Sequence, residues 1–190
     1  RTALITGGTS GIGYEIAKAY INAGAFCIIT GRSEEKIKKA CDKIESEVVN
    51  KGYIYGYQMD NTDVSAMPLK IKEIMAIVPS HQIDILVNNA GVVGGEIKNC
   101  TEEKYDQIVD TNLKGVFFLS QTIGRYMCEN SIQGNILNIG SSSCLRPATS
   151  AYTLTKNAIL GFTKGLAKIL SPYGITVNGI APGPTATPML

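Results

Sequence analysis

The stretch ALITGGTSGIG, residues Ala3–Gly13, joins an apolar segment of strand length to the helical pattern YEIAKAYINAG. It carries four glycines, Gly7, Gly8, Gly11 and Gly13. A turn this tight needs residues that tolerate a positive φ, and a backbone that approaches a phosphate needs missing side chains; glycine supplies both. The N–H groups at the start of the following helix would face the same anion. The stretch therefore predicts a strand, a phosphate-binding turn and a helix, with a purely structural turn as the simpler alternative.

The same alternation of strand and helix continues along the chain. Apolar runs of strand length lie at residues 2–6, 26–30, 53–59, 83–89, 134–140 and 174–180, with helical patterns near 11–23, 34–50, 62–78, 101–130 and 151–170. Nearly continuous hydrophobicity is typical of strands that are covered on both faces. The pattern predicts right-handed βαβ units and an α/β fold: a three-layer, doubly wound parallel sheet, the Rossmann fold. In such a sheet, ligands bind beyond the carboxyl ends of the strands, where the strand order reverses.

Length and composition restrict the class of protein. A chain of 190 residues, 44% of them apolar, suits a single α/β domain over residues 1–190. Eighteen basic and sixteen acidic residues form no long block of one sign, which argues against nucleic acid or acidic membranes as partners. Five cysteines without C-x-x-C spacing, no secretory signal and no apolar run of ~20 residues indicate a cytoplasmic protein with reduced thiols. His81 is the single histidine, so neither a Ser/His triad nor a histidine-rich metal site is expected, and we predict no metal.

Tyr152 and Lys156, in YTLTK, are four residues apart at the start of a helical pattern. This spacing puts them on one side of a helix, with Cβ atoms roughly 5–6 Å apart. Free tyrosine ionises near pH ~10, and a nearby ammonium favours the phenolate, which would suit a general acid-base. A surface pair is the alternative. An i,i+4 apolar stripe on the same helix is expected to face the core: Leu154, Ala158, Phe162, Leu166 and Leu170.

Several short motifs follow one another along the chain. TGGTSGIG has the form T-G-x-x-x-G-x-G, and it is followed by NNAG at Asn88–Gly91, TNLKGVFF around Asn112, YTLTK from Tyr152 and APGPTATPM from Ala181. Together they make the chain resemble the short-chain dehydrogenase/reductase family over nearly its whole length. The resemblance implies an NAD(P)-dependent enzyme that interconverts a carbonyl and a secondary alcohol of a small molecule, with a 3-oxoacyl-carrier-protein reductase as a generic guess. It also implies that the chain lacks its extreme N-terminus and a C-terminal segment with the substrate lid and last strand.

The resemblance assigns catalytic roles to residues of this chain. Tyr152 would exchange the proton with the substrate oxygen, and Lys156 would assist it and hold the nicotinamide ribose. Asn112 matches the asparagine that binds a water in the proton relay. The family's serine usually lies about thirteen positions before the tyrosine, where this chain has Ile139; the strand-end context favours Ser141 instead, with Ser142 and then Ser143 as fallbacks.

The residue after the second strand bears on the cofactor. A carboxylate there would bind the ribose 2′-hydroxyl of NAD, whereas Arg32 suits the 2′-phosphate of NADP because a guanidinium can donate two parallel hydrogen bonds. We therefore expect NADP, with NAD possible, unless Glu34 and Glu35 neutralise Arg32. Asp60 and Asn61 occupy the place where the family contacts adenine, although Asp60 could equally cap the following helix.

The expected cofactor-binding set is Gly7, Thr9, Ser10, Gly11, Ile12, Gly13, Arg32, Asp60, Asn61, Asn89, Ala90, Gly91, Tyr152, Lys156, Pro182, Gly183 and Thr187. The family further implies a homo-oligomer, a dimer or tetramer, formed partly by the helices at 112–130 and 151–170, where the small residues Ala151, Ala158 and Gly161 would allow close approach. Two other functions stay open: an NAD-dependent alcohol dehydrogenase on the same scaffold, and a dinucleotide-binding regulator without turnover.

Overall fold

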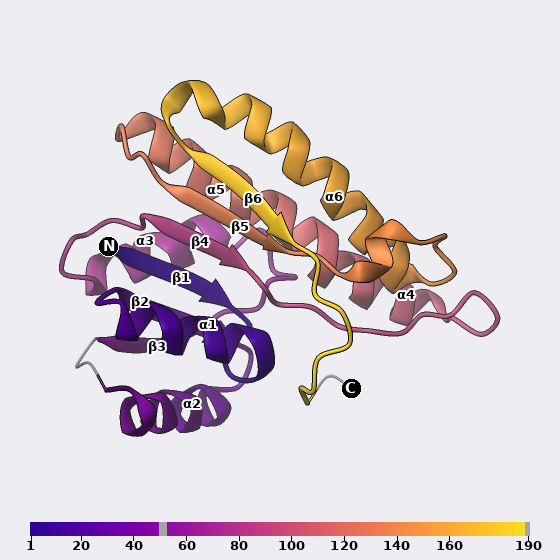
Figure 1. Cartoon of the computed structure of the whole chain (residues 1–190), viewed down its shortest axis with the longest axis horizontal. Helices are drawn as coiled ribbons and strands as arrows, with labels where there is room; N and C mark the ends of the chain where they lie inside the picture. The colour runs from indigo at the N-terminus through magenta and orange to yellow at the C-terminus, as the bar shows by residue number, and fades with distance from the viewer. Residues whose placement is uncertain (50–52, 189–190) are drawn as a thin grey trace.

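The computed structural model describes residues 1–49 and 53–188 (Figure 1). Its six strands are β1 (Thr2–Thr6), β2 (Phe26–Gly31), β3 (Ile54–Gln58), β4 (Ile85–Asn88), β5 (Asn135–Ile139) and β6 (Thr176–Ile180). They form one sheet in the order β3-β2-β1-β4-β5-β6, and every neighbouring pair is parallel. The predicted doubly wound sheet is confirmed, with the reversal of strand order between β1 and β4.

The helices largely follow the predicted ranges. They are α1 (Gly11–Asn22), α2 (Glu34–Glu47), α3 (Met67–Ile77), α4 (Glu102–Val109), α5 (Gly115–Glu129) and α6 (Ala151–Leu170), with a π-helical turn at Asp110–Lys114 and short 3-10 turns at Ser142–Leu145 and Ser171–Tyr173. The helix expected over 34–50 ends at Glu47, and residue 50 lies outside the described residues. The helix expected from residue 62 begins at Met67, because the side chains of Asp60 and Asp63 first bind the backbone N–H groups of Thr62 and Ala66 in turns.

Helices cover the sheet on both faces, as the apolar strands require. Ala3 and Ile5 of β1 pack in a cluster with residues of α1 and α2, such as Ala17 and Ile44. Leu4 belongs to a second cluster on the opposite face, with residues of α3, α5 and α6. Alternate residues of β1 thus enter different cores, and all five are buried, which explains the unbroken apolar run in the sequence.

Buried amides connect the strands and helices just below the carboxyl edge of the sheet. Asn88 and Asn138 are register partners in β4 and β5, and the Nδ2 of Asn88 donates to the Oδ1 of Asn138 at 2.8 Å. Asn88 also donates to Ser120 Oγ of α5 at 2.9 Å, and Asn138 donates to Thr163 Oγ1 of α6 at 2.9 Å. Because buried polar groups are costly unless paired, this network favours one position of α5 and α6 on the sheet.

The expected apolar stripe of α6 does not face the core along its whole length. Leu154 is 52% exposed and Ala158 is exposed, whereas Leu170 at the other end is buried. The prediction was wrong for the first half because each i,i+4 step rotates by about 40°, so four steps turn the stripe by about 160°. The sheet side of the first half instead carries Lys156 and Ile159.

Candidate active site

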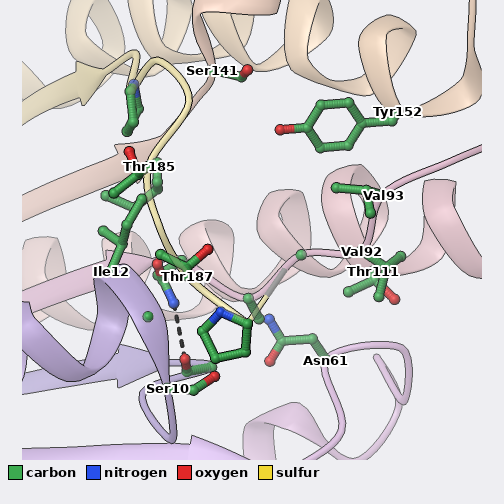
Figure 2. A pocket seen from close by; sticks show the side chains of 18 of the residues that line it. Ser10, Ile12, Asn61, Val92, Val93, Thr111, Ser141, Tyr152, Thr185 and Thr187 are labelled. Carbon is green, nitrogen blue, oxygen red and sulfur yellow. Dashed lines mark hydrogen bonds between the residues drawn. The ribbon is translucent and has the colours of Figure 1, made fainter. Parts of the chain in front are cut away.

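A cavity of about 890 Å³ lies beyond the carboxyl ends of the strands, at the reversal of strand order (Figure 2). Most of the residues singled out from the sequence line it: Gly7, Thr9, Ser10, Gly11, Ile12, Arg32, Asp60, Asn61, Asn89, Ala90, Gly91, Ser141, Tyr152, Lys156, Pro182, Gly183 and Thr187. Two others, Gly13 and Asn112, lie behind the lining and contact it. The fold thus brings together segments from both ends of the chain.

The glycine turn after β1 makes a backbone cradle. Gly7 and Gly11 have φ values of +64° and +57°, which favour glycine. A Cβ at Gly7 would lie 2.8 Å from the Cα of Ala90, and one at Gly11 would lie 3.2 Å from the Cβ of Thr187. At Gly13 a Cβ would collide with the side chain of Asn89. The turn therefore leaves bare backbone at the start of α1, which suits a pyrophosphate.

Thr6 and Asn89 hold the ends of β1 and β4 together. The Oγ1 of Thr6 accepts hydrogen bonds from the N–H groups of Asn89 at 3.0 Å and Ala90 at 3.1 Å. The Nδ2 of Asn89 donates to the carbonyls of Thr6 at 2.9 Å and Gly7 at 3.0 Å. Asn89 was predicted as a cofactor contact, whereas Thr6 was missed; its position at the last residue of a strand before the glycine turn is the signal that could have found it.

The end of the cavity beside β2 is basic. Arg32 is exposed there, and two residues that were not predicted, Ser33 and Lys36, line the same region. The alternative that Glu34 or Glu35 neutralises Arg32 is not observed among the described residues, and Glu35 instead pairs with Lys39 at 2.6 Å. This end can therefore receive a dianionic phosphate.

Asp60 and Asn61, after β3, line the same end. The Oδ1 of Asp60 accepts from the N–H and Oγ1 of Thr62, both at 2.9 Å, so it caps a turn and does not cap α3. Asn61 is 5% exposed, and its Nδ2 has no hydrogen-bond partner among the described residues. Figure 2 shows the amide of Asn61 directed toward the cavity. An unpartnered buried donor at this place fits a ligand that offers an acceptor, as a purine does.

Tyr152 and Lys156 lie in the first turns of α6. The helix start is fixed by a capping box, in which Ser150 Oγ accepts from Thr153 N at 3.1 Å and Thr153 Oγ1 accepts from Ser150 N at 3.0 Å. The Nζ of Lys156 lies 5.7 Å from the centre of the Tyr152 ring and donates to the carbonyl of Ile139 at 2.8 Å. Burial lowers the pKa of Lys156 to about 8, because it disfavours the charged form. The two side chains are adjacent, as their spacing predicted.

Ser141 faces Tyr152 across the cavity (Figure 2). Its Oγ accepts from the N–H of Ser143 at 3.1 Å and donates to Ser143 Oγ at 3.1 Å. Ser142 and Ser143 line the cavity as well, so all three serines stay candidates. Ile139, the residue at the family's usual spacing, is buried in β5 and offers only its carbonyl, which Lys156 binds.

Asn112 is 1% exposed within the π-helical turn. Its Oδ1 accepts from the N–H of Val92 at 2.8 Å, and its Nδ2 donates to the carbonyl of Val92 at 2.9 Å and to Thr155 Oγ1 at 3.2 Å. A Cβ at Gly91 would lie 3.3 Å from Asn112 Oδ1 and 3.8 Å from Lys156 Nζ. Asn112 therefore fastens the loop after β4 beside the buried lysine.

The described residues contain no group of three or more His, Cys, Asp or Glu side chains that could hold a metal ion. In the same part of the chain, no helix has the length and hydrophobicity to cross a membrane. The donors that do converge fit a dinucleotide: bare backbone for a pyrophosphate, cations for a further phosphate, and a lysine with hydroxyl groups at the far end.

Comparisons with known proteins agree with this geometry. The profile of the short chain dehydrogenase family matches residues 1–190. The chain is 35% identical to gluconate 5-dehydrogenase of Gluconobacter oxydans, over 98% of this chain and 72% of that protein. It is 37% identical to a 3-oxoacyl-acyl-carrier-protein reductase of Haemophilus influenzae, over 100% of this chain and 76% of that protein. A crystal structure of an actinorhodin polyketide ketoreductase with NADPH superposes with a TM-score of 0.88 at 33% identity, covering 100% of this chain and 72% of that one.

Proposed function

This chain belongs to the short-chain dehydrogenase/reductase family and is an NAD(P)-dependent oxidoreductase of alcohol and carbonyl groups; on that premise we propose that it uses NADP(H), with Tyr152 as its proton donor and acceptor. The observation that carries the proposal is the meeting of Tyr152, Lys156 and Ser141 at one end of a cavity whose other end is a glycine cradle beside Arg32. The bound nicotinamide supplies or accepts the hydride. The chain has to hold the two reactants and move one proton.

In the proposed reaction, the phenol of Tyr152 gives its proton to the substrate oxygen during reduction and takes it back during oxidation. Figure 2 shows its hydroxyl pointing into the cavity, where a carbonyl can approach. The Nζ of Lys156 lies 5.7 Å from the ring centre, which places a cationic group beside the proposed general acid-base.

Ser141 would donate a hydrogen bond to the substrate oxygen and hold it beside Tyr152. Ser142 and Ser143 line the cavity too, and Ser141 is preferred because it is buried at the end of β5. Asn112 would bind the relay water through its main-chain carbonyl, because both polar atoms of its side chain are engaged with Val92 and Thr155. Its side chain would then be a positioning group.

For the cofactor, we propose that Arg32, Ser33 and Lys36 bind the 2′-phosphate of NADP. The cations have no acidic partner among the described residues, and the cavity reaches them from the glycine cradle. Asp60 and Asn61 would contact the adenine, and Thr187, packed beside Gly11, would cover the pyrophosphate or carboxamide.

Two fluorescence titrations, one with NADPH and one with NADH, test the cofactor proposal directly, since the chain contains no tryptophan. We expect NADPH to bind at least about tenfold tighter, a difference of about 1.4 kcal/mol. Arg32→Gln should remove most of that preference, whereas Lys72→Gln, on α3 outside the cavity, should leave it intact. Equal or tighter NADH binding would favour the NAD-dependent alternative, and binding of neither would count against the dinucleotide site.

We further propose that residues 1–190 act as one dinucleotide-binding and catalytic unit, and that the enzyme is a homo-oligomer. The cavity is lined from β1 through the segment after β6, which supports the first proposal. Exposed apolar residues on α5 and α6 support the second: Phe117 is 43% exposed and Leu154 is 52% exposed. We also assign the enzyme to the cytoplasm, because its five cysteines are free thiols, which suits a reducing compartment.

One detail of the expected interface is corrected. Ala151 is 3% exposed and packs beside Gly95 within the chain, so it cannot allow a second copy to approach. Gly161 and Gly165 are more suitable, because a Cβ at either would meet no atom within 4 Å. The proposed contact face therefore lies farther along α6.

A further inference from the structure

Arg146 lies at the catalytic end of the cavity, in the loop between β5 and α6. It lines the cavity together with Ser143 and Tyr152, and it is exposed. Its side chain takes part in none of the ion pairs between the described residues. Neither the dinucleotide nor the proton transfer requires it, so its charge needs another explanation.

The charges around the cavity leave Arg146 without a counter-ion. Asp60 is the one acidic residue among the described residues that line the cavity, and it lies at the adenosine end with its Oδ1 bound to Thr62. Arg32 and Lys36 lie at that same end. Near the reacting groups, the described lining residues therefore present the cations of Arg146 and Lys156 and no acid. An anionic group on the substrate would balance this charge.

The backbone presents Arg146 in a fixed position. Its N–H donates to the carbonyl of Ser143 at 3.2 Å, which closes the 3-10 turn that begins after Ser141. Its φ of −123° and ψ of 160° are the extended values that a residue before a proline prefers, and Pro147 follows it. Cys144, 7% exposed, anchors the turn from inside. The backbone of Arg146 therefore loses little freedom when the guanidinium binds a ligand.

We propose that Arg146 binds a carboxylate of the substrate, so that the enzyme acts on keto acids and their hydroxy-acid products in preference to neutral ketones and alcohols. A guanidinium can donate two parallel hydrogen bonds to a carboxylate, which fixes orientation as well as affinity. The inference rests on the proposed function, because it assumes that Tyr152 and Ser141 hold the carbonyl at the same end of the cavity.

The test compares acid and ester forms of one carbonyl skeleton. NADPH oxidation is measured with acetoacetate and levulinate, which differ in the distance from carbonyl to carboxylate, and with their methyl esters. The wild type should prefer an acid, and Arg146→Gln should lower the acid-to-ester ratio of kcat/KM by about tenfold or more, mainly through KM for the acid. The acid-to-ester ratio of Arg146→Lys should lie between those of the wild type and Arg146→Gln, and Lys72→Gln should leave the ratio unchanged. A wild type that prefers the esters, or a ratio that Arg146→Gln does not change, overturns the proposal.

A second readout separates this proposal from the proposed function. If no probe supports NADPH oxidation, the proposed function fails for these carbonyls, and labelling of Arg146 by phenylglyoxal, followed by mass spectrometry, decides the inference. Protection of Arg146 by levulinate but not by methyl levulinate would support a carboxylate site. Equal labelling with both compounds, or weaker NADPH binding in Arg146→Gln, would overturn it, the latter by assigning the arginine to the cofactor.

Discussion

Tyr152 and Lys156 stand in unlike surroundings although they are one helical turn apart. Tyr152 is half-buried at the cavity, whereas Lys156 is 6% exposed and held by the carbonyl of Ile139. The phenol can therefore reach a substrate, while the ammonium is fixed beneath it. This division suits a proton donor and the charge that assists it.

Tyr152→Phe should abolish most turnover while NADPH still binds. The substitution keeps the ring and removes the phenolic proton that Tyr152 presents to the cavity, so kcat should fall by roughly a hundredfold to ten-thousandfold. Steady-state kinetics and the NADPH titration measure the two effects separately. Tyr173→Phe, at an exposed tyrosine beyond the end of α6, is the matched control and should leave kcat unchanged. Full turnover in Tyr152→Phe would contradict the assignment of Tyr152 as the proton donor and acceptor.

Lys156 should also make stability depend on pH in a defined window. Burial lowers its pKa from 10.5 to about 8, so between those values the unfolded chain binds more protons than the folded chain. The cost of burying the ammonium is full below pH 8 and disappears as pH rises toward 10.5. Relative to Lys156→Met, the wild type should gain up to roughly 3 kcal/mol of unfolding free energy across this window. Urea denaturation of both proteins at several pH values measures the difference.

A comparison of the wild type with Lys72→Met controls for the general effect of pH on the chain. Lys72 is exposed on α3, so the two proteins should show parallel pH profiles. If the wild type and Lys156→Met also gave parallel profiles, the lowered pKa of Lys156 would be refuted.

At the scale of elements, the π-helical turn at Asp110–Lys114 is the main departure from regular helix. The sequence predicted one helix over 101–130. The turn contains Asn112, whose side chain binds the N–H and the carbonyl of Val92, twenty positions earlier in the chain. We call this pair of hydrogen bonds the clasp. Such turns are frequent at functional sites. A local pattern cannot reveal this one, because its partner lies in another segment.

Asn112→Ala should destabilise the protein by about 2–4 kcal/mol, because it removes three hydrogen bonds and leaves polar groups of Val92 unpaired. It should also lower kcat, since Val92 lines the cavity. Thermal and urea denaturation, together with kinetics, check both effects. Asp110→Asn is the control in the same turn: its exposed ion pair with Lys114 should contribute less than about 0.5 kcal/mol. Similar losses in both variants would count against a special role for the clasp.

For the molecule as a whole, the strands and most helices could be predicted from their patterns. Strands that are buried on both faces have nearly continuous apolar sequences, as β1 does. The glycine cradle and the Tyr152 and Lys156 pair could be predicted because each depends on short-range spacing. Lys36 and Arg146 were missed for the opposite reason: they join the site only when distant segments meet at the edge of the sheet. The outward stripe of α6 was misjudged because a helix face was assigned without the rotation that accumulates along it.

The exposed face of α5 and α6 is the expected contact between copies of the chain. Phe117 of α5 is 43% exposed and lies 5.4 Å, between ring centres, from Phe162 of α6, so aromatic surface continues from one helix to the next. Beside it, Gly161 has open space where a Cβ would stand. We therefore expect the purified protein to be a dimer or tetramer, and Gly161→Arg to shift it to monomer by placing a bulky cation on this face.

The design separates assembly from folding. Replacing glycine in a helix with arginine raises helix propensity by about 1 kcal/mol, so the single chain should fold at least as well as before. Light scattering measures the mass, and circular dichroism checks the fold. Ser46→Arg, on the exposed side of α2, introduces the same side chain elsewhere and should leave the mass unchanged. A monomeric wild type would disprove the assembly itself. An oligomeric, folded Gly161→Arg would show that the interface lies on another face, because a buried arginine without a partner is too costly to be tolerated between two copies of α6.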